Sequence, residues 1–229
     1  MSTMKVKVIG LGGIGSILIE NLARYFQYRD ESWHLHLIDG DSYESKNRER
    51  QIFNAVGGNK ADTKREELER RYDNIIFSST SAFVNKSNID ELICEHDIIF
   101  CCVDNHTTRK MVSDKVKTLQ DCILISGGND LIDGNVQIYI RKGGEDVTPS
   151  LVDYHPEIQD PRDKHPEEAS CEELSKSAPQ IFFTNLTVAT IMCWVIYNIM
   201  TDGTDHIKSE VYFDMKMMAL NAVTRKVKD

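Results

Sequence analysis

The sequence predicts an α/β fold, in which a mostly parallel sheet carries helices on both faces and the C-terminal strands turn antiparallel. Short apolar runs of strand length alternate with longer segments of helical periodicity along most of the chain. A glycine-rich turn joins the first of these runs to the first helical segment. The stretch 97–103 contains an unbroken apolar run, which is typical of a strand buried on both faces.

Each element follows from its own periodicity and its flanking turn signals. Predicted strands cover residues 5–9, 35–38, 75–78, 97–103, 122–126, 136–140 and 210–214. Predicted helices cover residues 14–28, 49–54, 60–71, 89–95, 107–120 and 181–200. The pair Asp133-Gly134 predicts a turn before the strand at 136–140.

The segment 142–170 is polar and holds four of the five prolines, so we expect a long surface excursion rather than a second core. We therefore predict a single domain over 1–229, with a crossover loop at about 142–178. The apolar segment 181–200 approaches membrane-spanning length, but Thr and Asn residues dilute it, which favours a buried core helix.

Composition limits the classes of function. The chain has 229 residues, 41% hydrophobic and 28% charged, as in an ordinary globular protein. Its net charge of −9 argues against a general nucleic-acid binder, which needs a concentrated basic face. No signal peptide precedes the first strand, and four of six cysteines lie in apolar runs, which favours a reducing cytoplasm.

The glycine turn predicts a phosphate site. Residues 10–15 match G-x-G-x-x-G between a predicted strand and a predicted helix, the context that gives this weak pattern meaning. Gly10 permits the tight turn, Gly12 and Gly13 let the backbone approach phosphate, and Gly15 allows close helix packing. The helix N-terminus then offers free N–H groups and a partial positive charge. The alternative is a turn that only bends the chain.

Two acidic residues follow the second predicted strand. Asp39 stands at its carboxyl end, where it can accept hydrogen bonds from ribose hydroxyls, and Asp41 can share that role or simply be solvated. This arrangement serves NAD as well as ATP.

The residues after this acid favour ATP. Asn47, Arg50, Gln51 and Lys60 are concentrated in one short stretch. A dehydrogenase has no need of fixed cations here, whereas a triphosphate attacked at its α-phosphorus needs its charge neutralised from several sides. The alternatives are a surface salt bridge for Arg50 and a solvated Lys60 at a helix start.

In order, the chain carries the glycine turn, Asp39 with Asp41, an N-x-x-R-Q segment, Lys60, and Asp104-Asn105 followed by Arg109. This order resembles the ThiF/MoeB/ubiquitin-activating family, and in outline the short ThiF-type proteins of PRTRC gene clusters. The resemblance implies that Arg50 and Lys60 grip ATP phosphates and that Asp104 supports Mg²⁺. It also implies that Asn47, Gln51, Asn105 and Arg109 belong to the nucleotide site. Asp104 has a second interpretation, as a helix N-cap.

The resemblance further implies adenylation of the C-terminal glycine carboxylate of a small ubiquitin-like, β-grasp or sulfur-carrier protein, by a homodimer. Cys171 lies in a polar segment and would accept the activated acyl group as a thioester. Four glutamates around it would raise its pKa, against activation, unless the loop folds onto basic groups.

Two departures from the family pattern are visible. The chain lacks the paired C-x-x-C motifs of a structural zinc site, so we expect no zinc. It also lacks the N-terminal helix whose arginine reaches the partner's ATP site, so an arginine such as Arg162 would have to serve. His155, His165 and Cys171 match no tight zinc spacing, and we expect ordinary surface residues.

Two other functions remain open from the sequence. An NAD-dependent oxidoreductase is favoured by the glycine turn and Asp39 alone. A non-catalytic scaffold would keep the fold and bind a partner through the long polar loop.

Overall fold

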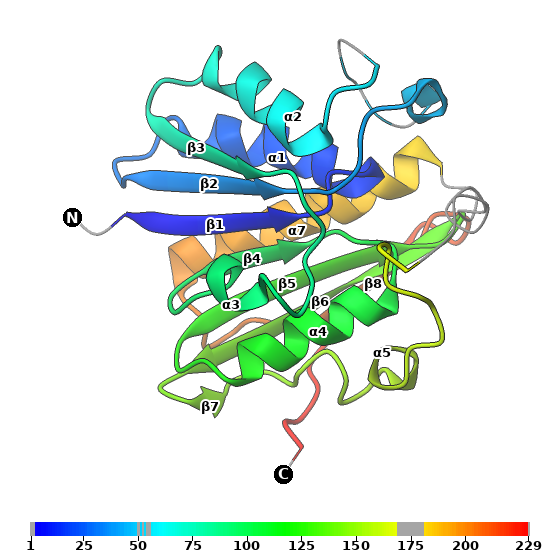
Figure 1. Cartoon of the computed structure of the whole chain (residues 1–229). Helices are drawn as coiled ribbons and strands as arrows, with labels where there is room; N and C mark the ends of the chain where they lie inside the picture. Colours follow the sequence, from blue (N-terminus) through cyan, green and yellow to red (C-terminus); the bar gives the residue numbers. More distant parts are fainter. Residues whose placement is uncertain (1–2, 50, 52, 54–55, 169–180, 229) are drawn as a thin grey trace.

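The computed structural model describes residues 3–49, 51, 53, 56–168 and 181–228. Its centre is a nine-stranded sheet with the order β3-β2-β1-β4-β5-β6-β8-β9, and β7 pairs with β6 (Figure 1). The parallel strands are β1 (Met4–Ile9), β2 (Trp33–Ile38), β3 (Ile75–Thr80), β4 (Ile98–Cys101) and β5 (Cys122–Asn129). The antiparallel strands are β6 (Asp133–Lys142), β7 (Glu145–Asp146), β8 (Glu210–Asp214) and β9 (Ala219–Val223). The predicted fold class is confirmed.

Helices cover both faces of this sheet (Figure 1). One face carries α1 (Gly13–Phe26), α2 (Lys60–Glu69) and α7 (Phe182–Asp202), and α1 packs against α7. The other face carries α3 (Ile89–Leu92), α4 (His106–Lys117) and the short α5 (Pro156–Gln159). A 3₁₀ helix, η1 (Ser45–Glu49), follows β2.

Two hydrophobic cores result from the alternation of side chains along the strands. Val6 and Val8 of β1 point into the core beneath α1 and α7, whereas Ile9 joins the core beneath α4. All four residues of β4 are buried, which confirms the prediction of a strand enclosed on both faces. The central strands therefore hold the ends of β1 and β4 in fixed positions.

The turn predicted at Asp133-Gly134 is wrong. Both residues belong to β6, and the turn lies just before them, closed by the bond from Asp130 N–H to the Asp133 carbonyl (3.0 Å). Gly134 is needed for packing: a Cβ there would lie 2.6 Å from the Gly128 carbonyl oxygen and 2.8 Å from the Phe213 ring.

The helix predicted at 49–54 also differs. Gln51 and Phe53 lie outside any helix, and the helical turn is η1, immediately before them. Asn47 Oδ1 accepts a hydrogen bond from Glu44 N–H (2.8 Å), a local bond that competes with a continuous α-helix. Residues 50, 52, 54 and 55 lie outside the described part of the chain.

The crossover segment was expected to lie on the surface, but several of its side chains are buried in the protein. Leu151 and Ile158 join the core beneath α4, and Thr148 bonds the β6 backbone through its hydroxyl. His155 and His165, expected on the surface, are both buried. His165 bonds the Val84 carbonyl oxygen (2.7 Å), so this histidine anchors the segment rather than facing solvent.

Helix α7 is buried along one face only. By length and composition it is the one helix among the described residues that could cross a membrane. Val188, Met192 and Ile196 pack into the core, while Phe183, Trp194 and Tyr197 are exposed on the other side. The prediction of a buried core helix is therefore correct for one face of α7 and wrong for the opposite face.

An ionic cluster around the buried His155 and Glu210 ties α5 to β8 and to the C-terminal segment. The carboxylate of Glu210 accepts hydrogen bonds from His155 Nε2, Tyr212 Oη and Arg225 Nε, each at 2.9 Å, and Glu157 contacts His155 Nδ1 at 2.9 Å. Burial would lower the pKa of His155, but the two carboxylates outweigh it and raise the pKa. Burial would raise the pKa of Glu210, and its three donors instead lower it to about 2.

This cluster predicts a pH-dependent stability. Because the folded pKa of His155 is raised, its contribution is present below pH ~6.5 and is lost as pH rises through the folded value. The free energy of unfolding should therefore decline above pH ~6.5, by at most about 1.4 kcal/mol per pH unit. Urea unfolding from pH 6 to 8, below the range in which unfolded cysteines ionise, measures this decline, which His155→Asn should abolish. The exposed His206 provides the control, since His206→Asn should keep the parent profile; an unchanged decline in His155→Asn would contradict the assignment.

Candidate functional site

A cleft of about 1090 Å³ opens at the carboxyl ends of β1, β2, β4 and β5 and the start of β6. Strand order reverses between β1 and β4, since β2 follows β1 on one side and β4 lies on the other. Open α/β sheets bind ligands in the crevice at such a point. The cleft also extends to β8 and α5.

The glycine turn forms the floor of the cleft, and each glycine has a different reason to be there. Gly10 adopts φ +86° and a Cβ would lie 3.0 Å from the Cys102 backbone, whereas a Cβ at Gly15 would overlap the Gly10 carbonyl oxygen. Gly12 meets nothing within 4 Å, so its backbone faces open cleft. Gly12 is also the N-cap of α1 and supplies no side-chain cap, which leaves the helix N-terminus available to an anion.

Gly13 packs against α7. A Cβ at Gly13 would overlap the side-chain amide of Asn185, which is fully buried and finds no hydrogen-bond partner among the described residues. No sequence pattern marks Asn185 as a site residue. This contact joins the start of α7 directly to the turn, and only a residue without a side chain fits between them.

Asp39 holds the turn in place from β2. Its carboxylate accepts hydrogen bonds from Leu11 N–H (2.5 Å) and Asp41 N–H (2.7 Å). Burial raises the pKa of Asp39, against the opposing effect of Lys60 and of the two backbone donors. The carboxylate lines the cleft beside the glycine turn, as predicted.

Lys60 lines the same cleft as the turn, at the first position of α2. It is only 6% exposed, and its Nζ contacts Asp41 Oδ2 at 2.9 Å. Asn59 caps α2 and donates to the carbonyl oxygens of Asp39 and Asp41, so one residue fixes both the acid loop and the lysine. The alternative of a solvated lysine is wrong, because Lys60 is buried at the start of α2.

The remaining residues of the predicted phosphate segment are only partly described. Asn47 and Gln51 are buried and line the cleft, and Gln51 Oε1 has no hydrogen-bond partner among the described residues. Lys46, which the sequence analysis did not select, lines the cleft as well. Arg50 lies outside the described residues, so its predicted contact with phosphate stays a prediction.

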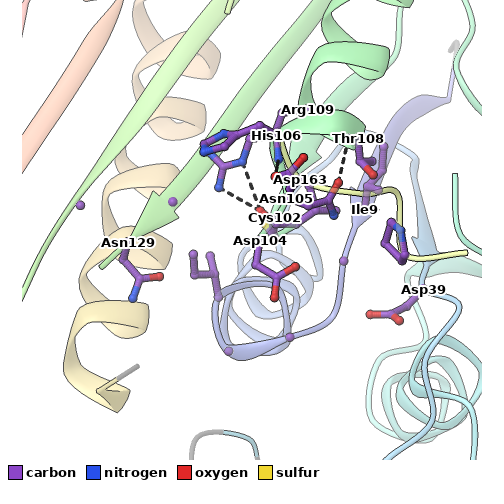
Figure 2. Close-up of a pocket in the computed structure, with 18 of the residues that line it drawn as sticks. Ile9, Asp39, Cys102, Asp104, Asn105, His106, Thr108, Arg109, Asn129 and Asp163 are labelled. Carbon is purple, nitrogen blue, oxygen red and sulfur yellow. Dashed lines mark hydrogen bonds between the residues drawn. The ribbon is translucent and has the colours of Figure 1, made fainter. Parts of the chain in front are cut away.

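Asp104 faces the cleft and does not cap α4. The cap is Asn105, whose Oδ1 accepts from Thr108 N–H (2.8 Å), and Asp163 from the crossover segment accepts from His106 N–H (2.5 Å) and Thr107 N–H (2.9 Å). Figure 2 shows the Asp104 carboxylate pointing into open space between Asn129 and Asp39. Asp104 is therefore not the N-cap of α4, because Asn105 and Asp163 accept the hydrogen bonds from the first N–H groups of that helix.

Arg109 was expected to belong to the nucleotide site, but its guanidinium is bonded to backbone carbonyl oxygens. It lines the cleft but is buried, and its guanidinium donates to the carbonyl oxygens of Val103 (2.9 Å) and Gly127 (2.9 Å). It also lies against Gly128, where a Cβ would be 2.5 Å from Nη2. These bonds tie the end of β4 to β5 and occupy much of its donor capacity.

The predicted acceptor thiol, Cys171, lies outside the described residues, so its role stays a prediction. Cys102 lines the cleft, but burial raises its pKa well above the ordinary value, so this thiol is not a nucleophile at neutral pH. The described residues contain no group of three His, Cys, Asp or Glu that could hold a metal ion. Arg162, suggested as a substitute arginine, does line the cleft.

A family comparison matches the ThiF family model to residues 1–228. The chain belongs to the ThiF family. Among curated relatives, the molybdopterin-synthase adenylyltransferase of Escherichia coli (strain K12) is 26% identical over 144 residues, 62% of this chain and 55% of that protein. The adenylyltransferase and sulfurtransferase MOCS3 of Danio rerio is 29% identical over 147 residues, 63% of this chain and 31% of that protein. The matched regions thus span about half, or less, of these relatives.

Solved structures agree on the fold. Escherichia coli MccB with MccA-N7isoASN superposes with a TM-score of 0.75 at 18% identity, covering 98% of this chain and 65% of that chain. PaaA superposes with a TM-score of 0.70 at 20% identity, covering 96% and 63%. At these identities the agreement concerns the arrangement of the elements, including the strands that bound the cleft.

The glycine turn yields a paired prediction. Gly15→Ala should lower the free energy of unfolding by about 1–3 kcal/mol or more, because the methyl group overlaps the Gly10 carbonyl oxygen. Gly12→Ala should change it little, since its methyl group would enter open cleft. Urea unfolding of both variants measures this difference. Equal losses would mean that the turn is not packed as described.

Proposed function

We propose that this chain adenylates the C-terminal carboxylate of a small ubiquitin-like or sulfur-carrier protein, with ATP bound at the glycine turn. The observation that carries the proposal is the buried cation of Lys60, held by Asp41 beside an uncapped helix N-terminus. A nucleotide phosphate is the ligand that both features favour. Family membership supports it, since the relatives matched in sequence are named adenylyltransferases.

The reaction needs no nucleophile from the protein. A carboxylate oxygen of the carrier attacks the α-phosphorus, the bond to the bridging oxygen breaks, and pyrophosphate leaves with that electron pair. The product is an acyl-adenylate. The protein contributes position and charge: α1 presents its N–H groups, Lys60 neutralises phosphate oxygens, and Asp39 accepts hydrogen bonds from the ribose hydroxyls.

Mg²⁺ fits this site as an ion bound jointly by ATP and one carboxylate. Magnesium in nucleotide enzymes is commonly held by one or two carboxylates together with substrate phosphates. The exposed carboxylate of Asp104 faces the cleft and is not used as the α4 cap, so it is the described side chain that would hold the ion. Such an ion would neutralise phosphate charge.

Lys60 provides the test. Lys60→Ala should weaken ATP binding measured by calorimetry, and should lower ATP–pyrophosphate exchange with a Gly-terminated carrier by about 10²-fold, the usual cost of removing one fixed charge. Lys110 offers a matched control, because it pairs with Asp114 on the solvent side of α4. Lys110→Ala should leave both measurements unchanged.

Other outcomes separate the alternatives. Failure to bind ATP would favour a scaffold, and nicotinamide binding that survives Lys60→Ala would revive the oxidoreductase. Absence of exchange with every small Gly-terminated protein encoded near this gene would contradict carrier adenylation. In the same mixture, intact-protein mass spectrometry tests Cys171: a carrier adduct that Cys171→Ser abolishes supports thioester transfer, and no adduct in the parent excludes it.

We further propose that the chain forms a homodimer through the outer face of α1 and α7. Phe183, Trp194 and Tyr197 form an exposed aromatic stripe there, and a groove of about 330 Å³ lies between Tyr25 of α1 and this face. A contiguous apolar face of this kind commonly marks a protein interface.

Trp194 tests this interface, since it is 53% exposed and supports no part of the core. Trp194→Lys should convert a dimer into a monomer, with a large rise in the dissociation constant, because an ammonium would be buried without a partner. Light scattering after gel filtration measures the mass. Ile76→Lys, on an exposed residue of β3 that does not line this groove, should remain dimeric; a parent that is monomeric at high concentration would contradict the proposal.

A further inference from the structure

Helices α1 and α7 run parallel to one another and in register. Gly13 in the first turn of α1 lies against Asn185 in the first turn of α7. The rings of Tyr25 and Tyr197, twelve residues further along each helix (13 to 25 and 185 to 197), have their centroids 6.5 Å apart. Both helices therefore begin at the same edge of the sheet, the edge that carries the cleft (Figure 1).

The starts of these two helices differ from those of the other long helices that the structure describes. The side chains of Asn59 and Asn105 cap α2 and α4. Gly12 and Ile181 precede α1 and α7 and supply no side-chain cap, and neither first turn contains an acidic residue. Each uncapped start carries roughly half a positive elementary charge. Because like charges side by side repel, this arrangement favours a bound anion.

The side chain of Asn185 is an independent sign of a ligand. It is fully buried, yet neither Nδ2 nor Oδ1 has a hydrogen-bond partner among the described residues. Buried polar atoms are nearly always paired, so an unpaired amide indicates a role other than stability. A Cβ at Gly13 would overlap Nδ2 and would lie 3.0 Å from Oδ1. The amino group of Asn185 therefore faces the start of α1 and adds positive charge there.

The start of α7 lies directly behind the cleft. Gly13 and Asn129 both line the cleft. Gly13 contacts Asn185, and Asn129 Nδ2 donates a hydrogen bond to Thr184 Oγ1 (3.1 Å). The first turn of α7 is thus separated from the cleft by single residues. An anion bound at the N–H groups of α1 is therefore close to the positive end of α7 as well.

We infer that α7 is a second phosphate-binding helix, and that the positive ends of α1 and α7 act together on one phosphate group. Asn185 is the positioning residue between the two ends. This inference rests on the proposed function, which makes that group the α-phosphate of ATP and of the acyl-adenylate.

The order of the helices on this face assigns the phosphates. Helix α2 packs on β2 and β3, α7 packs on β5 and β6, and α1 lies between them. Lys60 begins α2, so it lies on the side of α1 opposite to α7. In phosphoryl transfer the attacking and leaving oxygens are roughly in line across the phosphorus. Lys60 therefore neutralises the leaving pyrophosphate, while α7 acts on the phosphate that stays with the adenosine.

The first test replaces the amide by a carboxylate of the same shape. Asn185→Asp should weaken the binding of ATP and of AMP by about tenfold each, because both carry the α-phosphate. It should leave the affinity for adenosine unchanged, since adenosine has no phosphate. Calorimetry measures ATP and AMP, and displacement of a fluorescent ATP analogue measures adenosine. Lys60→Ala should weaken ATP more than AMP. Asn198→Asp, the same change at an exposed position in the last turns of α7, should keep the parent affinities.

The second test measures the charge at the two helix starts through stability. At pH 7.5, Asn185→Asp should unfold at a urea concentration no lower than the parent, because the introduced carboxylate meets two uncapped helix N-termini. Ala189 provides the comparison, since it is buried one turn further along α7. Ala189→Asp should be much less stable than Ala189→Asn, because a carboxylate buried there has no positive charge beside it.

Several outcomes would overturn the inference: parent affinities for ATP and AMP in Asn185→Asp, an equal loss for adenosine, a loss of stability as large as that of Ala189→Asp, or a parent that binds neither nucleotide. Pyrophosphate exchange distinguishes its failure from that of the proposed function. Exchange by the parent with unchanged affinities in Asn185→Asp refutes the role of α7 alone. The predicted affinities without any exchange refute adenylation and leave the two-helix phosphate site standing.

Discussion

The carboxylate of Asp39 is the contact on which the cleft depends. It joins the end of β2 to the glycine turn through Leu11 N–H and to its own loop through Asp41 N–H. Burying a carboxylate is unfavourable, as its raised pKa shows, and the two backbone donors and nearby Lys60 offset that effect. The same few bonds therefore determine where the turn lies, where α1 begins, and where the lysine stands.

The turn is also constrained from the other side, by packing rather than charge. Gly15 lies against the Gly10 carbonyl, Gly10 against Cys102 at the end of β4, and Gly13 against Asn185 of α7. Only Gly12 is unconstrained, and it faces the cleft. The backbone donors of α1 are thus directed at a ligand position by contacts that exist before any ligand binds, the condition under which fixed dipoles are most effective.

The sequence predicted the fold class and the first half of the cleft because both depend on local order. Hydrophobic periodicity locates β1, α1 and β2. Asp39 directly follows β2, Lys60 begins α2, and Asp104 lies between β4 and α4. The role of Asn59 was also open to sequence reasoning, since an asparagine before a helical segment is a common N-cap.

What the sequence could not predict depends on register and on contacts between distant segments. The capping of α4 by Asp163 and the burial of His155 and His165 require the crossover segment to fold back onto the cleft. The opposition of Asp133 and Asp214 exists only because β8 pairs with β6 in one register, and a shift by one residue would turn these side chains to the other face.

The antiparallel strands therefore do more than extend the sheet. A parallel sheet supplies one row of strand ends, and here that row carries the turn, Asp39 and Asp104. The reversal at β6 brings a strand start to the same edge, and β8 returns to it with its carboxyl end. The cleft consequently has a second wall whose side chains are independent of the nucleotide half. Arg109, bonded to the carbonyl oxygens of Val103 and Gly127, holds the end of β4 to β5 between the two walls.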